Sequence, residues 1–319
     1  MSSDPTLVPS GPASEEPGSP RRPHGMSRVF FGSGGLRAGW RLFLGILLIM
    51  LFTAGSRLLF RFTPAARALH QAQLGILTPG ILILTEGLQA LAVVLAALVM
   101  TRIDKHPFAE YGMPPALAFG KRFWQGWIFG FAMISALLGW IAALHGFSIA
   151  GLALGGAAIA RYGLLYLLGF FLVGIFEEFS FRGYLQATLA SGIGFWPSAI
   201  VWAFAFGGVH LGNPGEAKLG ALMTGTFGLL AVFTLRRTGN LWFAIGMHAA
   251  WDWGETFFYS VPDSGMAASG QLMHSAFHGP AWLTGGTVGP EGSWLVFVIL
   301  ALAAVAVHFL FRAGRREAV

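Results

Sequence analysis

The chain has 319 residues, of which 55% are hydrophobic and only 11% are charged, and its formal net charge is +6. Soluble domains usually carry about 25% charged residues, so this composition indicates a membrane protein whose positive charge lies in cytoplasmic loops. No basic stripe is interleaved with aromatic residues, which argues against a nucleic-acid partner. Cysteine is absent, which excludes disulfides, thiolate metal sites and a cysteine nucleophile.

The N-terminal residues 1–28 are rich in Pro, Ser, Gly and charge, with no apolar periodicity. Such a segment cannot bury enough apolar surface to fold, so we predict a disordered tail. The first apolar run begins only near Trp40, and no small-residue cleavage site follows it closely, so we expect no signal peptide. The rest of the chain, 29–319, is predicted to form one transmembrane domain.

Eight apolar segments follow, and most have room for the roughly 20 residues of a membrane-spanning helix. They cover about 40–60, 77–101, 123–145, 162–189, 195–211, 217–235, 240–259 and 293–312. Arg and Lys gather in alternate connections, and the long loop 260–292 contains neither. This alternation predicts an all-α polytopic bundle of about eight helices with the N and C termini in the cytoplasm. Gly126 and Gly130 have the spacing that lets membrane helices approach closely.

Six polar residues interrupt three of the apolar segments. They are Glu177, Glu178, Arg182, His210, His248 and Asp252. Ionisable side chains are unfavourable in hydrocarbon, so inside a membrane segment each of them is a functional candidate.

Helical spacing divides the first three of these residues. Glu178 and Arg182 are four residues apart and therefore share a helix face, whereas Glu177 points about 100° away. One interpretation is a structural ion pair with a spare carboxylate. The other is that the pair braces the helix while Glu177 faces a polar cavity and acts as a general base or acid.

The histidines are more ambiguous when each is taken alone. His248 lies one turn before Asp252, with Glu255 on roughly the same face, so it is either a satisfied core histidine, a ring oriented by Asp252, or a metal ligand. His210 follows Phe206 by four residues, and this spacing alone is weak evidence for a functional role. Glu86 is a further buried acid for which a hydrogen-bonding role and a functional role are both open.

Order and spacing together resemble the CPBP family of intramembrane proteases, which includes the CAAX prenyl endopeptidases and the bacterial Abi-type proteins. The family motifs E-E-x-x-x-R, F-x-x-x-H and H-x-x-x-N, or a similar polar residue at the last position, read here as EEFSFR, FGGVH and HAAWD. The resemblance covers a motif core at about 160–260. It implies an eight-helix bundle and makes 29–319 a CPBP-type protease domain.

The resemblance also implies a role for each matching residue. Glu177 and His210 would activate the attacking water, and His248 and Asp252 would stabilise the oxyanion or complete the polar site. Glu178 and Arg182 would be supporting residues.

Asp252 departs from the asparagine that is typical of the prenyl endopeptidases, because an ionised carboxylate cannot donate to an oxyanion. It is then protonated, or it orients His248, or it helps to bind a metal. In the last case Glu177, His210 and His248 would be the ligands of a divalent metal such as zinc. A metalloprotease mechanism and glutamate-activated water both stay open.

The depths of the two motif helices also conflict. Glu177 lies near the middle of segment 162–189, whereas His210 lies near the end of its own segment. The two side chains meet only if the fourth helix is tilted, or if the fifth starts deep or is broken.

We therefore expect an intramembrane endopeptidase that contacts membrane lipid and cleaves a peptide or membrane-protein substrate. Only Lys105, Lys121 and Lys218 are lysines among 20 basic residues, which suggests a bacterial protein of the cytoplasmic membrane. A CAAX substrate is not expected in that case. The alternatives are a non-catalytic scaffold or bacteriocin-immunity-type protein on the same fold, and a transporter, for which no internal repeat is visible. The substrate and the oligomeric state are not determined by the sequence.

Overall fold

The computed structural model describes residues 27–32, 35–60, 76–213 and 215–311, and the chain divides into two units, Met1–Arg37 and Ala38–Val319. The first unit contains a short helix, α1 (Ser27–Phe30), and an antiparallel pair of strands, β1 (Phe31–Gly32) and β2 (Gly35–Leu36). The predicted disordered tail 1–28 lies outside the described residues except for its last two, which belong to α1.

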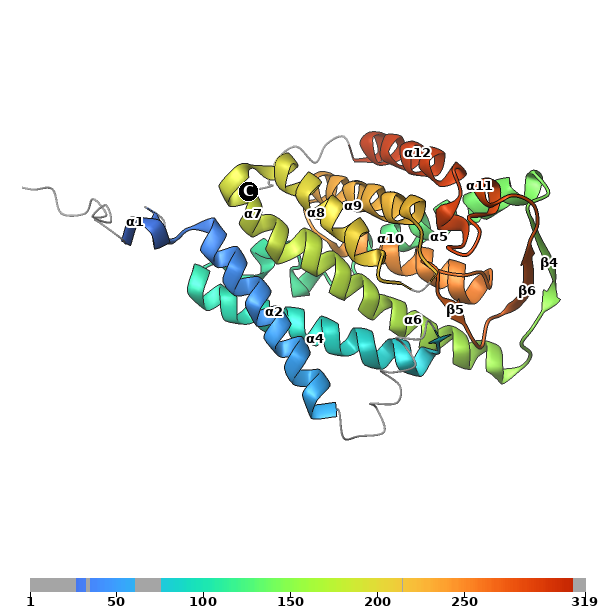
Figure 1. The fold of residues 1–319 in the computed structure, drawn as a ribbon, viewed down its shortest axis with the longest axis horizontal. Helices are drawn as coiled ribbons and strands as arrows, with labels where there is room; N and C mark the ends of the chain where they lie inside the picture. The colour runs from blue at the N-terminus through green and yellow to red at the C-terminus, as the bar shows by residue number, and fades with distance from the viewer. Residues whose placement is uncertain (1–26, 33–34, 61–75, 214, 312–319) are drawn as a thin grey trace, which may run out of the picture. The chain divides into compact units, whose positions relative to one another are not determined.

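The second unit is a bundle of helices (Figure 1). Its main helices are α2 (Ala38–Phe60), α4 (Pro79–Asp104), α5 (Lys121–Ala143), α6 (Ala157–Glu178), α7 (Leu185–Ile193), α8 (Phe195–His210), α9 (Lys218–Thr238), α10 (Trp242–Trp253) and α12 (Leu295–Leu310). Every predicted apolar segment corresponds to a helix, and one segment is split into two. The predicted all-α bundle is therefore confirmed.

Five helical stretches in the described residues are long and apolar enough to cross a membrane. They are Ala38–Leu58, Pro79–Asp104, Lys121–Ala143, Ala157–Ile193 and Lys218–Thr238. The remaining apolar helices are shorter, and the placement of the two termini in the cytoplasm stays a prediction.

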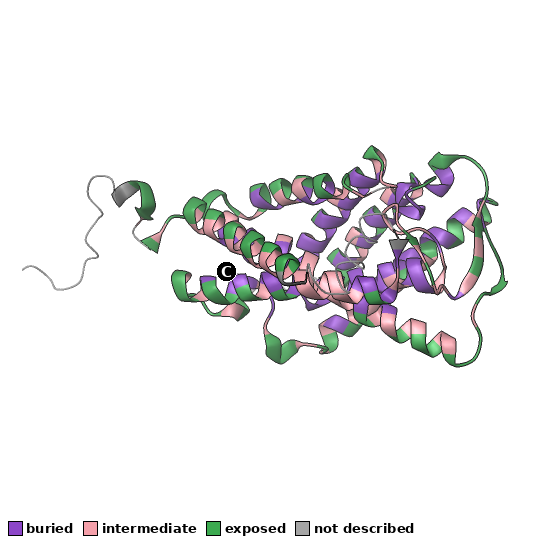
Figure 2. Ribbon diagram, turned by 60° about the horizontal axis from the view of Figure 1, so that its bottom comes forward, coloured by how far each residue is buried: buried purple, intermediate pink, exposed green. Residues whose placement is uncertain are grey.

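Helices α10 and α2 differ in how far the rest of the protein buries them (Figure 2). In α10, every residue from Trp242 to Asp252 is buried. In the outer helix α2, only 6% of the apolar window is buried inside the protein, and apolar side chains such as Met50 are exposed. A helix that exposes this much apolar surface is suited to contact with lipid, whereas α10 is suited to hold a polar site away from it.

Two glycines of α5 place α10 against it. A Cβ atom at Gly126 would clash with the carbonyl oxygen of Phe243, and one at Gly130 would clash with that of Met247. The predicted close approach at these two glycines is confirmed, and it fixes α10 at the position of Met247, directly before His248.

The fourth predicted segment is broken where the acidic motif ends. α6 ends at Glu178, and a π-helical turn, η3 (Phe179–Tyr184), leads into α7. Gly183 is non-helical, with φ −90° and ψ −111°, and interrupts the backbone there. Glu177 is therefore near the end of a helix, as is His210, the last residue of α8. The break lies in the fourth helix rather than the fifth, and it removes the conflict in depth between these two residues.

The long loop 260–292 is held by short elements that pack near one end of α10. β5 (Ala267–Ala268) pairs in parallel with β3 (Ile76–Leu77), and β6 (Met273–Phe277) pairs antiparallel with β4 (Phe147–Leu152). The loop also contains α11 (Ala281–Thr284) and η5 (Pro290–Gly292), and it follows the π-helical turn η4 (Gly254–Phe258) that ends α10.

Candidate active site

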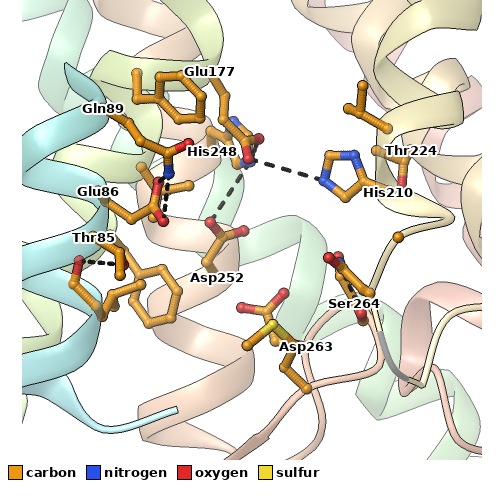
Figure 3. Close-up of a pocket in the computed structure, with 18 of the residues that line it drawn as sticks. Thr85, Glu86, Gln89, Glu177, His210, Thr224, His248, Asp252, Asp263 and Ser264 are labelled. Carbon is orange, nitrogen blue, oxygen red and sulfur yellow. Dashed lines mark hydrogen bonds and ion pairs between the residues drawn. The ribbon is translucent and has the colours of Figure 1, made fainter. Parts of the chain in front are cut away.

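A cavity of about 1050 Å³ lies within the bundle. Its walls come from α2, α4, α6, α8, α9, α10 and the loop that follows α10. All four predicted catalytic residues line it, namely Glu177, His210, His248 and Asp252 (Figure 3). The tertiary structure thus brings together side chains from three helices that are separated in the sequence.

Glu177 lies between the two histidines (Figure 3). Its Oε1 is 4.0 Å from Nε2 of His210, and its Oε2 is 3.6 Å from Nε2 of His248. Both distances exceed a direct hydrogen bond, and a water molecule beside each pair of atoms could bridge them from the cavity. Oε2 of Glu177 is buried and accepts no hydrogen bond from any described group.

His210 is held by its own helix. Its Nδ1 lies 2.8 Å from the carbonyl oxygen of Phe206, one turn earlier in α8. A carbonyl can only accept, so Nδ1 carries the proton of this hydrogen bond, and Nε2 is directed toward Glu177. The Phe206 ring also packs edge-on against the His210 ring, with centroids 4.7 Å apart, because residues four apart on a helix are neighbours, and this contact gives the F-x-x-x-H spacing a local reason.

His248 is held by a carboxylate from another helix. Its Nδ1 lies 2.8 Å from Oε1 of Glu178, and its Nε2 lies 3.6 Å from Oδ2 of Asp252. The hydrogen bond that orients the ring therefore comes from Glu178 of α6, whereas Asp252 lies beside the nitrogen that faces the cavity. The sequence contained no signal for this contact, because the two residues are 70 positions apart.

The predicted ion pair of Glu178 with Arg182 is confirmed. Nη1 of Arg182 lies 3.3 Å from Oε1 of Glu178, and both side chains are buried. The guanidinium also lies 3.9 Å from the centre of the Phe206 ring, a cation–π contact. A Cβ atom at Gly228 would clash with Nη2 of Arg182, so this glycine leaves the space that the arginine fills. Arg182 therefore neutralises the carboxylate that holds His248.

Glu86 lines the same cavity from α4. Both of its carboxylate oxygens lie 2.9 Å from Nε2 of Gln89, one turn further along the helix (Figure 3). The hydrogen-bonding role of Glu86 is therefore observed, and a functional role in the cavity stays a prediction.

A second group of acids lies toward the loop side of the cavity, and the sequence did not point to it. Asp263 and Glu291 line the cavity, and Glu255 of η4 lies with them instead of sharing a site with His248. Glu291 accepts hydrogen bonds from the Trp251 indole at 3.1 Å and the Ser264 hydroxyl at 2.6 Å. Burial and the nearby carboxylate of Glu291 raise the pKa of Asp263 above its ordinary value.

The two groups differ in how they could hold a metal. Within the described residues, Glu255, Asp263 and Glu291 each offer a ligand atom within 4.8 Å of the others, and the predicted ligands Glu177, His210 and His248 do not form such a group. Their donor atoms are nevertheless of the right kind, because both histidines present Nε2 while Nδ1 is held by a protein oxygen. A zinc site at these three residues stays a prediction.

Comparison with known proteins identifies the motif core. Residues 159–254 match the model of a family described as type II CAAX prenyl endopeptidase Rce1-like. This segment belongs to the CPBP family of CAAX-type proteases. A search of curated proteins and a search of solved structures gave no match.

The CPBP match spans all six motif residues, from Glu177 to Asp252, and confirms the resemblance on which their selection rested. At the family level, this match of residues 159–254 supports a CAAX-type protease. With five helical stretches long enough to cross a membrane, the chain is an integral membrane protein.

Proposed function

We propose that this chain is an intramembrane endopeptidase that hydrolyses a peptide bond of a membrane-associated substrate, with Glu177 as the base that activates water. The observation that carries the proposal is the position of Glu177, within 4.0 Å of Nε2 of His210 and 3.6 Å of Nε2 of His248 in one cavity. A general base must be able to reach the proton that it abstracts, directly or through one water molecule.

Water activation would occur between Glu177 and His210. With Nδ1 of His210 donating to Phe206, its Nε2 can accept a hydrogen bond from a water that also donates to Oε1 of Glu177. The carboxylate takes the proton as the water oxygen attacks the peptide carbonyl, and it later gives that proton to the leaving amine. Oε2 of Glu177 accepts no described hydrogen bond, so it is free to bind this water or the amine.

Oxyanion stabilisation is assigned to His248. Its Nδ1 is anchored on Glu178, so only the Nε2 edge faces the cavity. A doubly protonated ring would donate from Nε2 to the developing oxyanion, and the carboxylates of Glu178 and Asp252 on its two sides would stabilise that imidazolium. Asp252 thereby contributes through His248, which removes the objection that a carboxylate cannot donate to an oxyanion.

A metal would change the supply of the nucleophile, and binding it would require the three ligand atoms to move closer together than they lie in this structure. Glu177, His210 and His248 would hold it through a carboxylate oxygen and two Nε2 atoms, and a bound zinc ion would lower the pKa of its water to about 7. Phe206 and Glu178 would then orient the two imidazole ligands from their far sides.

The outer helix α2 supports a membrane-associated substrate. Three residues of α2 line the cavity, namely Ala54, Arg57 and Leu58. Most of the surface of this helix is not covered by other parts of the protein. A substrate segment in the lipid would reach the cavity beside α2 without passing through water. We propose the bacterial cytoplasmic membrane as the location, on the basis of the arginine-rich composition.

The test compares new protein termini in cells that express the wild type, Glu177→Gln or Glu110→Gln at equal levels. Glu110 is an exposed acid outside the cavity and controls for handling of the membranes. Mass spectrometry of membrane peptides should find termini that the wild type and Glu110→Gln share and that Glu177→Gln lacks. Those termini would identify the substrate as well.

Two results would contradict the proposal. Identical termini in all three strains, with all three proteins folded, would favour the non-catalytic scaffold and lead to a search for a binding partner. Wild-type termini in the Glu177→Gln strain would show that the protein cleaves without Glu177 as the base.

A further inference from the structure

A second polar group lies outside the proposed catalytic residues and takes no part in the mechanism. It consists of Glu255 in η4, Asp263 in the following loop and Glu291 in η5, and we call it the acidic cluster. One carboxylate oxygen of each residue lies within 4.8 Å of the corresponding oxygens of the other two. Asp263 (Figure 3) and Glu291 also line the loop side of the cavity.

Glu255 is the most unusual member of the acidic cluster. Its side chain is fully buried, and neither of its carboxylate oxygens accepts a hydrogen bond from any described group. Removing a carboxylate from water without a partner is strongly unfavourable. A buried carboxylate that is directed at two other acids and lacks any partner of its own therefore points to a ligand that the protein binds there.

Among the described residues, no Lys, Arg or His side chain forms an ion pair with the acidic cluster. Loop 260–292 contains no Lys or Arg. The donors that reach Asp263 and Glu291 are neutral, from Thr256, Ser264 and Trp251. These donors satisfy lone pairs but leave the charge in place.

The backbone next to Glu255 packs closely at a glycine. Gly289 has φ +96°, and a Cβ atom built there would lie 3.3 Å from Oε1 of Glu255 and would clash with the carbonyl oxygen of Pro262. A side chain at this position would fill the space between a carboxylate and a carbonyl oxygen. Because Gly289 has no side chain, the Pro262 carbonyl and the Glu255 carboxylate can both lie close to its backbone, which places a further oxygen near the acidic cluster.

We propose that the acidic cluster binds one calcium ion through carboxylate oxygens of Glu255, Asp263 and Glu291. Calcium prefers oxygen ligands at about 2.3–2.6 Å, so two ligands on opposite sides of the ion are roughly 4.6–5.2 Å apart. Magnesium binds at about 2.0–2.1 Å, which limits that separation to roughly 4.2 Å. The three oxygens all lie within 4.8 Å of one another, a spacing that one calcium ion can bridge, and an all-oxygen ligand set is the kind that calcium prefers.

The ion would join three segments around the cavity. Its ligands come from the turn that ends α10, from the loop after it and from η5. Glu291 also accepts the hydrogen bond of Trp251, three residues after His248. The bound ion would thus hold the end of α10 and the loop side of the cavity in place, and it would not contact the reacting bond.

The test uses the purified full-length chain in detergent, freed of calcium with a chelator. Calcium added up to about 10 mM, well above the ~10⁻⁴–10⁻³ M dissociation constants of extracellular modules, should raise the Tm of the wild type by roughly 3 °C or more. Magnesium should raise it less. Terbium, a luminescent calcium substitute, should show emission excited through tryptophan, because the Trp251 indole lies 3.1 Å from a ligand oxygen.

Glu255→Gln is the informative variant, because its carboxylate accepts no described hydrogen bond that the substitution could break. It should lose the calcium response and the terbium emission. Without calcium it should unfold at the wild-type temperature or above, since it removes an unpaired buried charge. Glu110→Gln and Glu177→Gln should both respond as the wild type does, which separates this site from the predicted zinc ligands.

Three results would overturn the proposal: no calcium response in the wild type, a response retained in Glu255→Gln, or a response lost in Glu177→Gln but not in Glu255→Gln. The first would mean that protons neutralise the cluster, and the last would place the ion at the catalytic residues. If Glu255→Gln does not fold, Asp263→Asn is tested in its place with the same expectation. Proteolysis is not measured, so failure of the proposed function would leave these outcomes unchanged.

Discussion

The catalytic residues and the acidic cluster are two groups of carboxylates joined by one helix, and they are neutralised in different ways. Around His248, each acid faces a base, since Glu178 meets Arg182 and Glu177 meets two histidines. Around Glu255, acids face only acids and neutral donors. The acids around His248 form a network of opposite charges within the protein. The acids around Glu255 have no such partners, and we expect them to bind a cation from solution.

This difference predicts opposite consequences for the removal of one carboxylate. Glu177→Gln should reduce the rate of peptide-bond cleavage by about 10²–10⁴-fold, the usual contribution of a general base. Glu255→Gln, which would lose the calcium ion, should reduce that rate far less, by roughly threefold, because neither its carboxylate nor the ion contacts the reacting bond. The measurement is cleavage of the substrate identified from new termini, with purified variants at equal concentration. Equal loss in both variants would mean that the two groups act as one site.

Removal of Arg182, the basic partner of Glu178, should lower the stability of the protein. Arg182→Met leaves the buried carboxylate of Glu178 without its cation, and the loss of one partner of a buried pair reduces the free energy of unfolding by about 3–5 kcal/mol. Thermal unfolding in detergent should detect this loss. The double variant Glu178→Gln, Arg182→Met should recover part of it. An Arg182→Met protein as stable as the wild type would show that the Arg182 pair does not stabilise Glu178.

Helix α10 carries His248 and Asp252 and continues into the turn that contains Glu255. It can be displaced through its contact with α5. Gly130→Ala introduces a methyl group against the Met247 carbonyl and should lower the free energy of unfolding by about 1–3 kcal/mol. Gly139→Ala lies on the same helix, where a Cβ atom meets nothing within 4 Å, and should change stability little. Thermal unfolding of the two variants gives the comparison. Equal stability would mean that α10 is not held by this contact.

Asp252→Asn should have the smallest effect on cleavage. Its Oδ2 is 3.6 Å from Nε2 of His248, too far for a strong hydrogen bond, and an amide at this position can itself donate to an oxyanion. We expect kcat to fall by less than about tenfold, which corresponds to about 1.4 kcal/mol. A loss as large as that of Glu177→Gln would instead assign Asp252 an essential negative charge.

Much of the fold could be predicted because the relevant signals are local. Apolar runs of membrane length became helices, since a backbone in lipid must form its hydrogen bonds internally. The pair of Glu178 with Arg182 and the contact of His210 with Phe206 both follow from four-residue spacing on one helix. The spacing of Gly126 and Gly130 in α5 likewise predicted a close contact between helices.

The site itself could be predicted only as a set of candidates. The motif order selected Glu177, His210, His248 and Asp252, but the hydrogen bond between Glu178 and His248 joins residues far apart in sequence. The sequence did not predict the break at Gly183, because a single glycine in a long apolar run is not a signal for a π-helical turn. The acidic cluster was missed because its members are isolated acids in or near a loop, with no shared spacing.

By itself, the sequence determined that this protein is an all-α membrane bundle and which six residues are costly to bury, because both depend on the character of each segment alone. The tertiary structure decided the rest. It ended α6 at Glu178 so that Glu177 reaches both histidines, and it gave Glu178 the task of orienting His248. It also gathered three unpaired acids beside the cavity. Contacts of this kind depend on how helices pack against one another, and no local pattern records that.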